Sequence, residues 1–333
     1  MLPIKQIFPG LVLAVGVSVL TLAAEPLQRA LFGWVALDGL VLAILVGTLV
    51  HTGLGLQARY RPGVQFAAKT VLEVAVVLLG GTISAGAVLQ VGPAVLGVVV
   101  LVVVLALVAS YGIGRWLGLD ARLATLVACG NSICGNSAIM ATAPVIKAPA
   151  EDVAASIAFT AALGVVVVLL LPLGAKLFGF SEWQYGVIAG LSVYAVPQVL
   201  AATVPVGVLS SQIGTLVKLM RVLMLGPVVL FLGLVQGRKS RVSLPLSTLV
   251  PWFIVGFLAM MVARSAGVLP EAALPGLQLV SSYLTVVSMA ALGLSVDLRS
   301  VAASGGRVLA AGFFSIAVLI AMATAAALLL GTV

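Results

Sequence analysis

The chain has 333 residues, of which 62% are hydrophobic and only 8% are charged, and its mean hydropathy is +1.30. Soluble domains carry about 25% charged residues, so this composition excludes an ordinary soluble domain and predicts an all-α polytopic membrane protein. The apolar runs are continuous rather than alternating, which argues against a transmembrane β-barrel. The net charge of +8 is spread over short loops, so it indicates orientation in the lipid bilayer rather than a nucleic-acid partner.

A helix needs about 20 apolar residues to cross a bilayer, and breaks at proline, glycine and charge clusters divide the chain into about eleven predicted transmembrane helices. We expect all of them to belong to one integral membrane transporter domain, residues 1–333. In that domain an extra N-terminal helix, 7–24, precedes a repeat-bearing transport unit, 38–331. The predicted helices cover residues 7–24, 38–56, 66–90, 94–118, 122–146, 153–178, 184–206, 209–235, 248–268, 276–297 and 306–331.

Basic residues in the loops predict which side of the membrane each loop occupies. With the N-terminus inside, 12 of the 17 Lys and Arg residues lie on the cytoplasmic side, whereas Arg29, Lys147 and Arg264 lie outside. The remaining two, Lys218 and Arg221, fall within a predicted helix. This bias predicts a cytoplasmic N-terminus and a C-terminus on the outside.

A short internal echo relates residues 79–84 to residues 292–297 at an offset of 213. The first copy ends the third predicted helix on the outside and the second ends the tenth on the inside, as inverted repeats do. Chance similarity between apolar segments is the alternative. A simple five-plus-five repeat would pair helix three with helix eight, and the sequence leaves that conflict open.

The most unusual segment is a polar tandem, Cys129–Ser137, within the fifth predicted helix. Glycine, Asn and Ser weaken helices, and irregular backbone at membrane depth survives only where it is buried in protein or lines a wet cavity. Unwinding there would create a helix N-terminus near Ser137, which favours an anion, whereas small-residue packing between helices is the alternative. The candidate substrate-binding residues are Asn131, Ser132, Gly135, Asn136 and Ser137.

A second break is predicted in the seventh helix at Tyr194–Gln198, where Pro197 removes a backbone donor. Two broken helices that cross at the midplane would form a typical transporter site, and a proline kink without ligand contacts is the alternative. Tyr194 and Gln198 are the candidate binding residues of this segment.

Lys218 and Arg221 lie three residues apart in the eighth predicted helix, so they share one of its faces. Cations at mid-membrane are costly and usually functional, and no acidic residue of the same helix neutralises them. We therefore expect them to attract an anionic substrate, with a structural ion pair to an acid elsewhere as the alternative.

Two carboxylates are candidates for binding a coupling proton or Na⁺. Glu73 follows Lys69 by four residues and Asp297 precedes Arg299 by two, so interfacial ion pairs are the alternative for both. No metal site is expected, because the two cysteines lie five residues apart with no histidine or acid nearby. No nucleotide-binding motif appears either, so we do not expect ATP-driven pumping by this chain alone, and we expect no cofactor. We also expect no enzyme activity, because one histidine, no paired acids within the helices and two cysteines without a nearby base make no catalytic constellation.

Several segments resemble the YeiH-type family of proposed sulfate exporters, in order along roughly residues 38–331. The resemblance implies a multi-pass protein of a bacterial-type inner membrane that exports an anion. It also implies a distant likeness to bile-acid/sodium symporters and sodium/proton antiporters, with inverted repeats and a core domain that moves against a panel domain. The similar segments are Gly135–Ile139, Ala143–Ile146, Glu151–Ala154, Pro172–Gly174, Gln198–Ala202, Lys218 with Arg221 and Pro227, and Ala291–Leu298.

Members of that family commonly carry a histidine and an acid where this chain has Tyr194 and Ala195. Coupling through that carboxylate is therefore not expected here. We predict a secondary transporter for a small anion, such as sulfate, a sulfonate or an organic acid, that works by alternating access. A sodium/proton-type cation antiporter is the alternative, a membrane-embedded enzyme or structural subunit is a third class, and a homo-oligomer stays open.

Overall fold

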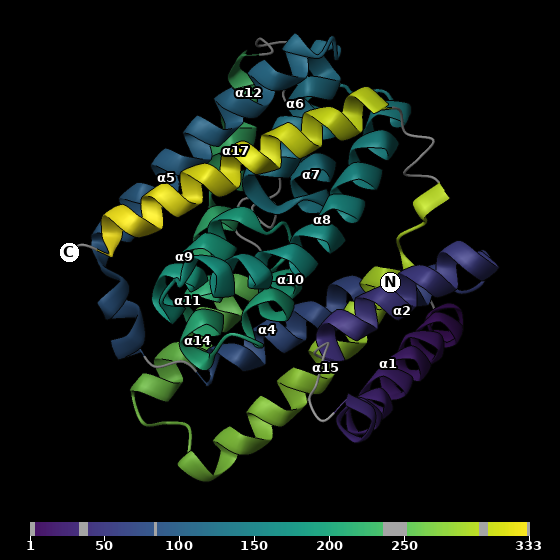
Figure 1. The fold of residues 1–333 in the computed structure, drawn as a ribbon, viewed down its shortest axis with the longest axis vertical. Coiled ribbons are helices and arrows are strands. Elements are labelled where there is room, and N and C mark those ends of the chain that lie inside the picture. Colours follow the sequence, from purple (N-terminus) through teal and green to yellow (C-terminus); the bar gives the residue numbers. More distant parts are fainter. Residues whose placement is uncertain (1–3, 33–38, 83–84, 236–251, 300–305, 332–333) are drawn as a thin grey trace. The chain divides into compact units, whose positions relative to one another are not determined.

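The computed structural model describes residues 4–32, 39–82, 85–235, 252–299 and 306–331, and within them all regular elements are helical (Figure 1). Predictions for Ile83, Ser84 and residues 248–251, and the loop charges of Arg238, Lys239 and Arg241, lie outside these ranges. The helices are α1 (Ile4–Phe32), α2 (Gly39–Leu54), α3 (Arg61–Phe66), η1 (Ala67–Val71), α4 (Leu72–Gly80), α5 (Ala85–Trp116), α6 (Ala121–Cys129), η2 (Gly130–Cys134), α7 (Asn136–Ile146), α8 (Ala150–Phe178), α9 (Glu182–Ser192), α10 (Val196–Thr203), α11 (Val208–Leu223), α12 (Leu225–Val235), α14 (Trp252–Ser265), η3 (Glu271–Ala273), α15 (Leu274–Leu294) and α17 (Gly306–Leu330).

The chain forms two compact units. Unit 1 comprises Met1–Ala87 and Phe253–Arg299, and unit 2 comprises Val88–Trp252 and Ser300–Val333. Among the described residues, seven helices are long and apolar enough to cross a membrane, and four shorter apolar helices accompany them. The chain is therefore a multi-pass membrane protein, while the single transporter domain stays a prediction and the count of eleven crossings is not confirmed. The seven long spans are Lys5–Ala24, Arg61–Gly80, Ala94–Trp116, Ala150–Ala175, Val208–Val235, Glu271–Leu294 and Gly306–Leu330.

Glycines let the helices of unit 1 pack backbone to backbone. A Cβ atom at Gly293 of α15 would overlap the backbone of Ile44 in α2, and one at Gly80 of α4 would overlap the backbone of Phe257 in α14. Only glycine permits such an approach, because it has no side chain. The two contacts share one offset, since Gly80 and Gly293 lie 213 residues apart and so do Ile44 and Phe257.

The N-terminal helix α1 packs on α3 through a reciprocal pair of glycines. A Cβ atom at Gly10 would overlap the backbone of Tyr60, and one at Gly63 would overlap the backbone of Ile7. The predicted extra helix 7–24 is therefore an integral part of unit 1, and it also packs against α2 and α15.

Residues 184–206, predicted as the seventh spanning helix, instead fold back as a helical hairpin, α9–α10, here called hairpin 2. The Tyr185 hydroxyl near its start donates to the carbonyl of Ala202 near its end (2.9 Å). Just beyond, the Ser210 hydroxyl donates to the carbonyl of Glu182 (2.7 Å), so the chain returns to its point of entry. The prediction of a single spanning helix here is wrong, because hydropathy cannot distinguish a crossing from two short apolar helices side by side.

Residues 122–146, predicted as the fifth spanning helix, form a second such hairpin, α6–η2–α7, here called hairpin 1. A Cβ atom at Gly130 of η2 would meet the side chain of Ile139 in α7. Leu126 of α6 belongs to one hydrophobic cluster with Ile139 and Ile146 of α7. The two arms thus lie against each other, so the prediction of a single crossing by residues 122–146 is wrong here as well, whereas the unwinding expected within Cys129–Ser137 is found at Gly135.

Local sequence starts both hairpins with a helix cap. The Asp120 carboxylate accepts a hydrogen bond from the backbone N–H of Arg122 at the start of α6 (3.0 Å), and this bond lowers the pKa of Asp120 below its ordinary value. At the start of α9, the Ser181 hydroxyl accepts from the N–H of Gln184, whose side-chain oxygen accepts from the Ser181 N–H. Such caps satisfy N–H groups that have no partner inside the helix.

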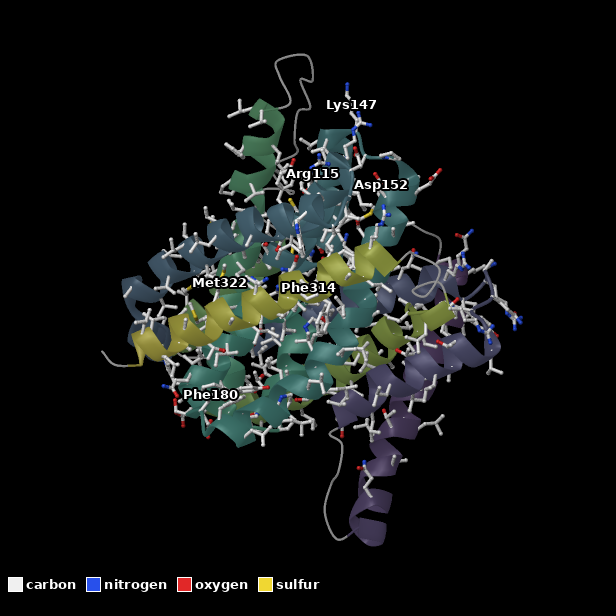
Figure 2. All side chains as sticks on the ribbon, turned by 45° about the horizontal axis from the view of Figure 1, so that its top comes forward. Arg115, Lys147, Asp152, Phe180, Phe314 and Met322 are labelled. Carbon is white, nitrogen blue, oxygen red and sulfur yellow. The ribbon has the colours of Figure 1, made fainter. Side chains whose placement is uncertain are left out.

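The two hairpins enter unit 2 from opposite ends of α8. Hairpin 1 joins the N-terminus of α8 through residues 147–149, and hairpin 2 joins its C-terminus through residues 179–181. Figure 2 shows Lys147 and Asp152 at one end of unit 2 and Phe180 at the other. The expected pair of broken helices crossing at the midplane is therefore corrected to two hairpins that approach each other tip to tip.

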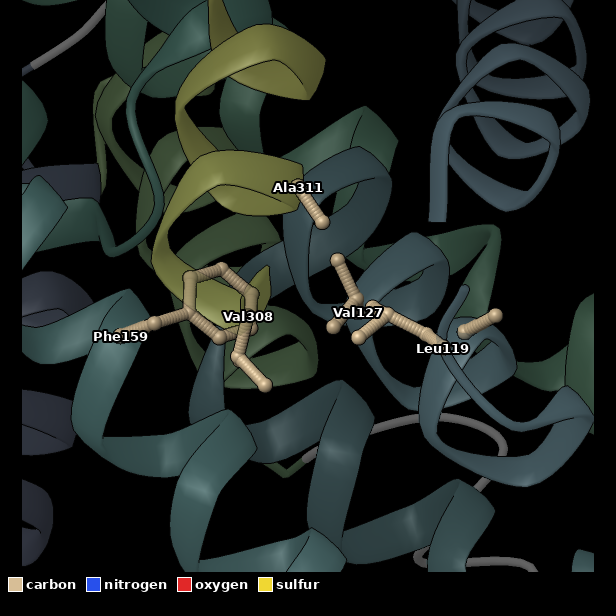
Figure 3. Packing of buried hydrophobic residues seen from close by; sticks show 6 residues of the cluster. Leu119, Val127, Phe159, Val308 and Ala311 are labelled. Atoms are coloured by element: carbon tan, nitrogen blue, oxygen red, sulfur yellow. The ribbon is translucent and has the colours of Figure 1, made fainter. Parts of the chain in front are cut away.

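A hydrophobic core anchors the arms of hairpin 1 within unit 2. Phe159 of α8 packs with Val127 of α6 and with Val308 and Ala311 of α17 (Figure 3). Gly312 leaves room for the Phe159 ring, because an added Cβ atom would overlap that ring. This core holds α6, α8 and α17 together.

Candidate functional site

The tip of each hairpin is a short break between two helical arms. In hairpin 1 the break is Gly135, whose φ of 63° and ψ of −126° suit glycine far better than other residues. In hairpin 2 the break is Val193–Ala195, where Val193 and Ala195 have extended backbone. The tips touch, because a Cβ atom at Gly135 would lie 3.2 Å from the Cβ of Tyr194.

Lys218 of α11 connects the two tips. It is fully buried, and its ammonium nitrogen donates to the carbonyl of Ile133 in hairpin 1 (2.6 Å) and to that of Val193 in hairpin 2 (3.0 Å). An ammonium group has three N–H donors, so these two bonds leave one donor for a further acceptor.

Arg221, one helical turn further along α11, makes the same connection. Its Nη2 donates to the carbonyl of Asn131 (3.0 Å) and its Nε to that of Ser132 (3.2 Å), both in hairpin 1. Its Nη1 donates to the carbonyls of Gly190 (3.0 Å) and Val193 (3.2 Å) in hairpin 2. Arg221 is also fully buried, so the planar guanidinium is completely enclosed by the two tips.

These carbonyls lie at the C-terminal ends of the first arms of the hairpins. The last four carbonyls of a helix have no partner inside that helix, and this end carries a partial negative charge. Lys218 and Arg221 therefore donate hydrogen bonds to carbonyls that have no partner within their own helices. Without these donors, burial of the carbonyls would be costly. The two cations hold the hairpins in position, which is a structural task as well as a source of positive charge.

A series of hydrogen bonds between side chains also joins the two tips. The Tyr194 hydroxyl donates to Oδ1 of Asn131 (3.1 Å), and Nδ2 of Asn131 donates to the hydroxyl of Ser110 in α5 (3.1 Å). All three side chains are buried. Asn131 is thus oriented by one partner from hairpin 2 and one from α5.

The second arms begin at the tips with polar residues. Oδ1 of Asn136 accepts from the Thr160 hydroxyl in α8 (2.6 Å), and the next residue, Ser137, is exposed. Oε1 of Gln198 accepts from the backbone N–H of Ala195 (3.2 Å) and so caps α10. The Gln198 side chain also packs so closely on Gly164 of α8 that any Cβ atom there would overlap it.

The structure brings together the residues that the sequence nominated for substrate binding. Glu73 and Asp297, the coupling candidates, belong to unit 1 instead and are half-buried there. Asp297 accepts a hydrogen bond from the backbone N–H of Arg299 (3.0 Å). In the described ranges no group of three or more His, Cys, Asp or Glu could hold a metal ion. The residues gathered at the tips are Asn131, Ser132, Gly135, Asn136, Ser137, Tyr194, Gln198, Lys218 and Arg221.

Sequence reasoning missed the part of hairpin 2 that faces Arg221. Gly190-Leu191-Ser192-Val193 repeats the pattern of Gly130-Asn131-Ser132-Ile133 at an offset of 60. Lys218 binds the carbonyls of the equivalent residues Ile133 and Val193. A comparison of the chain with itself at this offset would have found the second tip. Ser110 and Thr160 carry no such signal, because single hydroxyl residues are common in apolar helices.

Comparison with known proteins gives consistent matches over most of the chain. A family model described as conserved hypothetical protein 698 matches residues 9–312. A UPF0324 membrane protein of Brucella melitensis is 56% identical over 306 residues, which cover 92% of this chain and 86% of the relative. One of Agrobacterium fabrum is 51% identical over 316 residues, covering 95% and 91%. One of Bacillus cereus is 33% identical over 280 residues, covering 82% and 81%.

No solved structure matches the chain. The sequence relatives alone decide the family, because they span nearly the full length of both partners in each pair. The chain belongs to the UPF0324 membrane protein family, which is the YeiH-type family that its motifs resemble.

Proposed function

We propose that the chain is a secondary transporter that exports a small anion, such as sulfate, a sulfonate or an organic acid, by alternating access. One observation carries this proposal. Lys218 and Arg221 are fully buried where both hairpin tips meet, and in the described part of the chain they bond to backbone carbonyls and to no carboxylate.

The charges of the helix ends at the tips cancel one another. The C-terminal ends of the first arms carry about −0.5 charge each and the N-terminal ends of α7 and α10 about +0.5 each. The two side-chain cations therefore remain as the net charge of the tips. A buried charge without a counter-charge is costly. An anion bound at the tips would supply that counter-charge, which a cationic substrate could not do.

The start of α7 offers groups suited to hold such an anion. The first N–H groups of a helix have no helical partners, and this end of the helix attracts negative charge. The exposed Ser137 hydroxyl lies in that first turn, and the Lys218 ammonium binds the carbonyl of Ile133, four residues before Ser137, with one N–H donor left for an anion. We assign Ser137 and Lys218 as anion ligands and Asn131, Tyr194 and Gln198 as residues that position the tips.

The hairpins change the topology but leave the sidedness as predicted. Because each hairpin returns to its own side, Lys147 moves to the inside and Lys176 moves to the outside. The division of the loop charges stays 12 to 3, and the N-terminus stays inside and the C-terminus outside. In this topology two hairpins re-enter, and the crossings are α1, α2, α3–α4, α5, α8, α11–α12, α14, α15 and α17.

Helix directions in unit 1 support this topology. Gly293 near the end of α15 lies at Ile44 of α2, and beyond the end of α15 the N–H of Leu298 donates to the hydroxyl of Thr52, further along α2 (3.2 Å). The two helices thus run in the same direction. Helices α2 and α15 must then be separated by an odd number of crossings, which the proposed topology provides.

The same topology supports inverted repeats with an exchanged order. Helices α2, α3–α4 and α5 correspond to α14, α15 and α17 at the offset of 213, and hairpin 1 with α8 corresponds to hairpin 2 with α11–α12. Every pair then has opposite orientation in the membrane, as inverted repeats require. Hairpin 1 and α8 come last in the first repeat, whereas hairpin 2 and α11–α12 come first in the second repeat. This exchange of order explains why the third predicted helix, 66–90, is paired with the tenth, 276–297.

A cation antiporter of the sodium/proton type would need a carboxylate at the tips, and residues 130–137 and 190–198 contain none. Coupling of anion export to a proton or Na⁺ through Glu73 or Asp297 stays a prediction. A membrane-embedded enzyme would need a catalytic constellation, and the tips offer hydroxyls and amides without a base.

The test measures thermal stability of the purified protein with sulfate, sulfite, sulfonates, small carboxylates, Na⁺ and Li⁺. A ligand that binds the folded state raises its melting temperature by mass action. We expect an oxyanion to do so in the wild type and not in Ser137→Asp. An acid in the first turn of α7 favours the helix, so loss of the response would not reflect unfolding.

The matched control is Thr125→Asp, which places the same charge on a half-exposed position nearer the base of hairpin 1. The melting temperature of this variant should rise with the anion as in the wild type. Anion flux into proteoliposomes should likewise be normal in the wild type and in Thr125→Asp, and lost in Ser137→Asp. Stabilisation by Na⁺ or Li⁺ alone, or a normal anion response in Ser137→Asp, would overturn the proposal.

A further inference from the structure

Besides the glycine contacts described above, two further segments of unit 1 match each other at the offset of 213 residues. The start of α3 contains Pro62-Gly63-Val64-Gln65, and the start of α15 contains Pro275-Gly276-Leu277-Gln278, again at an offset of 213. Both segments are helix starts, because proline in the first turn is compatible with helical backbone. The two helix starts can therefore be compared position by position.

In the first copy this helix face is covered by α1. Gly63 is buried against Gly10, and each glycine excludes a Cβ atom on the other. One turn further on, Ala67 is completely buried. Helix α1 has no equivalent in the second copy, because the predicted repeat begins only at α2.

In the second copy the equivalent face is bare. An added Cβ atom at Gly276 would meet no atom within 4 Å. Leu279 is 56% exposed, Val280 48% and Tyr283 51%. These four residues, here called the α15 stripe, follow the spacing i, i+3, i+4 and i+7, so they line one side of the helix. A glycine on a bare apolar stripe costs helix stability and gains nothing from lipid.

We infer that the α15 stripe is the contact by which a second copy of this chain binds, with α15 packed on α15 about a two-fold axis. The contact between α1 and α3 shows that this type of helix start is covered by a helix that places its own glycine opposite. The Gly10 face of α1 is already occupied by Gly63. A two-fold axis supplies the required glycine, because it places Gly276 of one copy against Gly276 of the other. This contact does not depend on the proposed substrate.

Cysteine cross-linking in native membranes tests the inference with the full chain. Leu279→Cys, Val280→Cys and Tyr283→Cys are oxidised in turn, and the matched control is Gln278→Cys. Gln278 is also exposed, but it lies about half a helical turn away from the stripe at the same depth. The wild type is the negative control, because its two cysteines, Cys129 and Cys134, are both buried and should not form a disulfide between two copies. We expect a disulfide-linked dimer from the stripe variants and none from Gln278→Cys or the wild type.

A second variant separates dimerisation from folding. Gly276→Leu has free space in the monomer, so its melting temperature should not fall, whereas it should abolish the cross-link of Leu279→Cys. Cross-linking that is absent at all stripe positions, or equal at Gln278→Cys, would overturn the inference. An adduct whose mass differs from twice 33.7 kDa would do so too, because it would show another partner.

Discussion

Helix contacts in unit 1 pass through glycine backbone, whereas the contacts at the centre of unit 2 pass through two buried cations. Gly80 and Gly293 bring their helices close by lacking a side chain, and no charge is involved. Lys218 and Arg221 join two hairpin tips by donating to carbonyls that the helices themselves leave unpaired. The first kind of contact depends on volume and the second on hydrogen bonds and charge.

This difference shows how one membrane protein can combine closely packed helices in one unit with a polar centre in the other. Lipid offers no hydrophobic force between apolar helices, so unit 1 relies on close packing at small residues. Broken helices are tolerated in a membrane only where their free backbone groups find other partners, and in unit 2 the cations are those partners. Substitutions should therefore affect the two units through different physical terms.

The largest effect is expected from Arg221→Leu. It leaves the carbonyls of Asn131, Ser132 and Gly190 buried without their donor, and each unsatisfied buried carbonyl should cost about 1–3 kcal/mol of unfolding free energy. Equilibrium unfolding of the purified protein in detergent measures this loss. Arg221→Lys keeps the charge but has fewer donors, so its stability should lie between those of the wild type and Arg221→Leu. A variant Arg221→Leu as stable as the wild type would show that the cation does not hold the tips.

A smaller effect is expected from Gly80→Ala or Gly293→Ala in unit 1. The added methyl group overlaps backbone atoms of Phe257 or Ile44, and such overpacking should cost about 1–3 kcal/mol. The matched control is Gly97→Ala in α5, where no atom lies within 4 Å, so the melting temperature should stay equal or rise. The two glycine variants should still be stabilised by the oxyanion, because its proposed site lies in unit 2. If they lose both stability and this stabilisation by the anion, the proposed difference between the two units is wrong.

The smallest effect is expected from Tyr194→Phe, which removes one hydroxyl between the two tips. Loss of its hydrogen bond to Asn131 should cost about 0.5–1.5 kcal/mol. Tyr185→Phe is the matched control, because it removes a similar bond within hairpin 2. Both should lower the melting temperature slightly, but only Tyr194→Phe should alter the anion affinity. Equal affinities in both variants would remove Asn131 from the positioning role.

The class of the protein and the composition of its polar centre can be read from the residues alone. Continuous apolar runs require helices in a membrane, because the backbone has no other partner there. Polar and charged residues at membrane depth are costly, and this cost makes Cys129–Ser137, Tyr194, Gln198, Lys218 and Arg221 conspicuous in the sequence. The apolar positions around them could be exchanged among similar residues without changing this pattern.

The turns at Gly135 and Val193–Ala195, where residues 122–146 and 184–206 fold back rather than cross, are visible only in the folded chain. Hydropathy measures how apolar a segment is, and a hairpin of two short helices is as apolar as one long helix. The return of the chain depends on contacts between distant residues, such as the hydrogen bond from Tyr185 to Ala202. The partners of the two cations are equally hidden in the sequence, because backbone carbonyls are present at every residue and become special only where a helix ends.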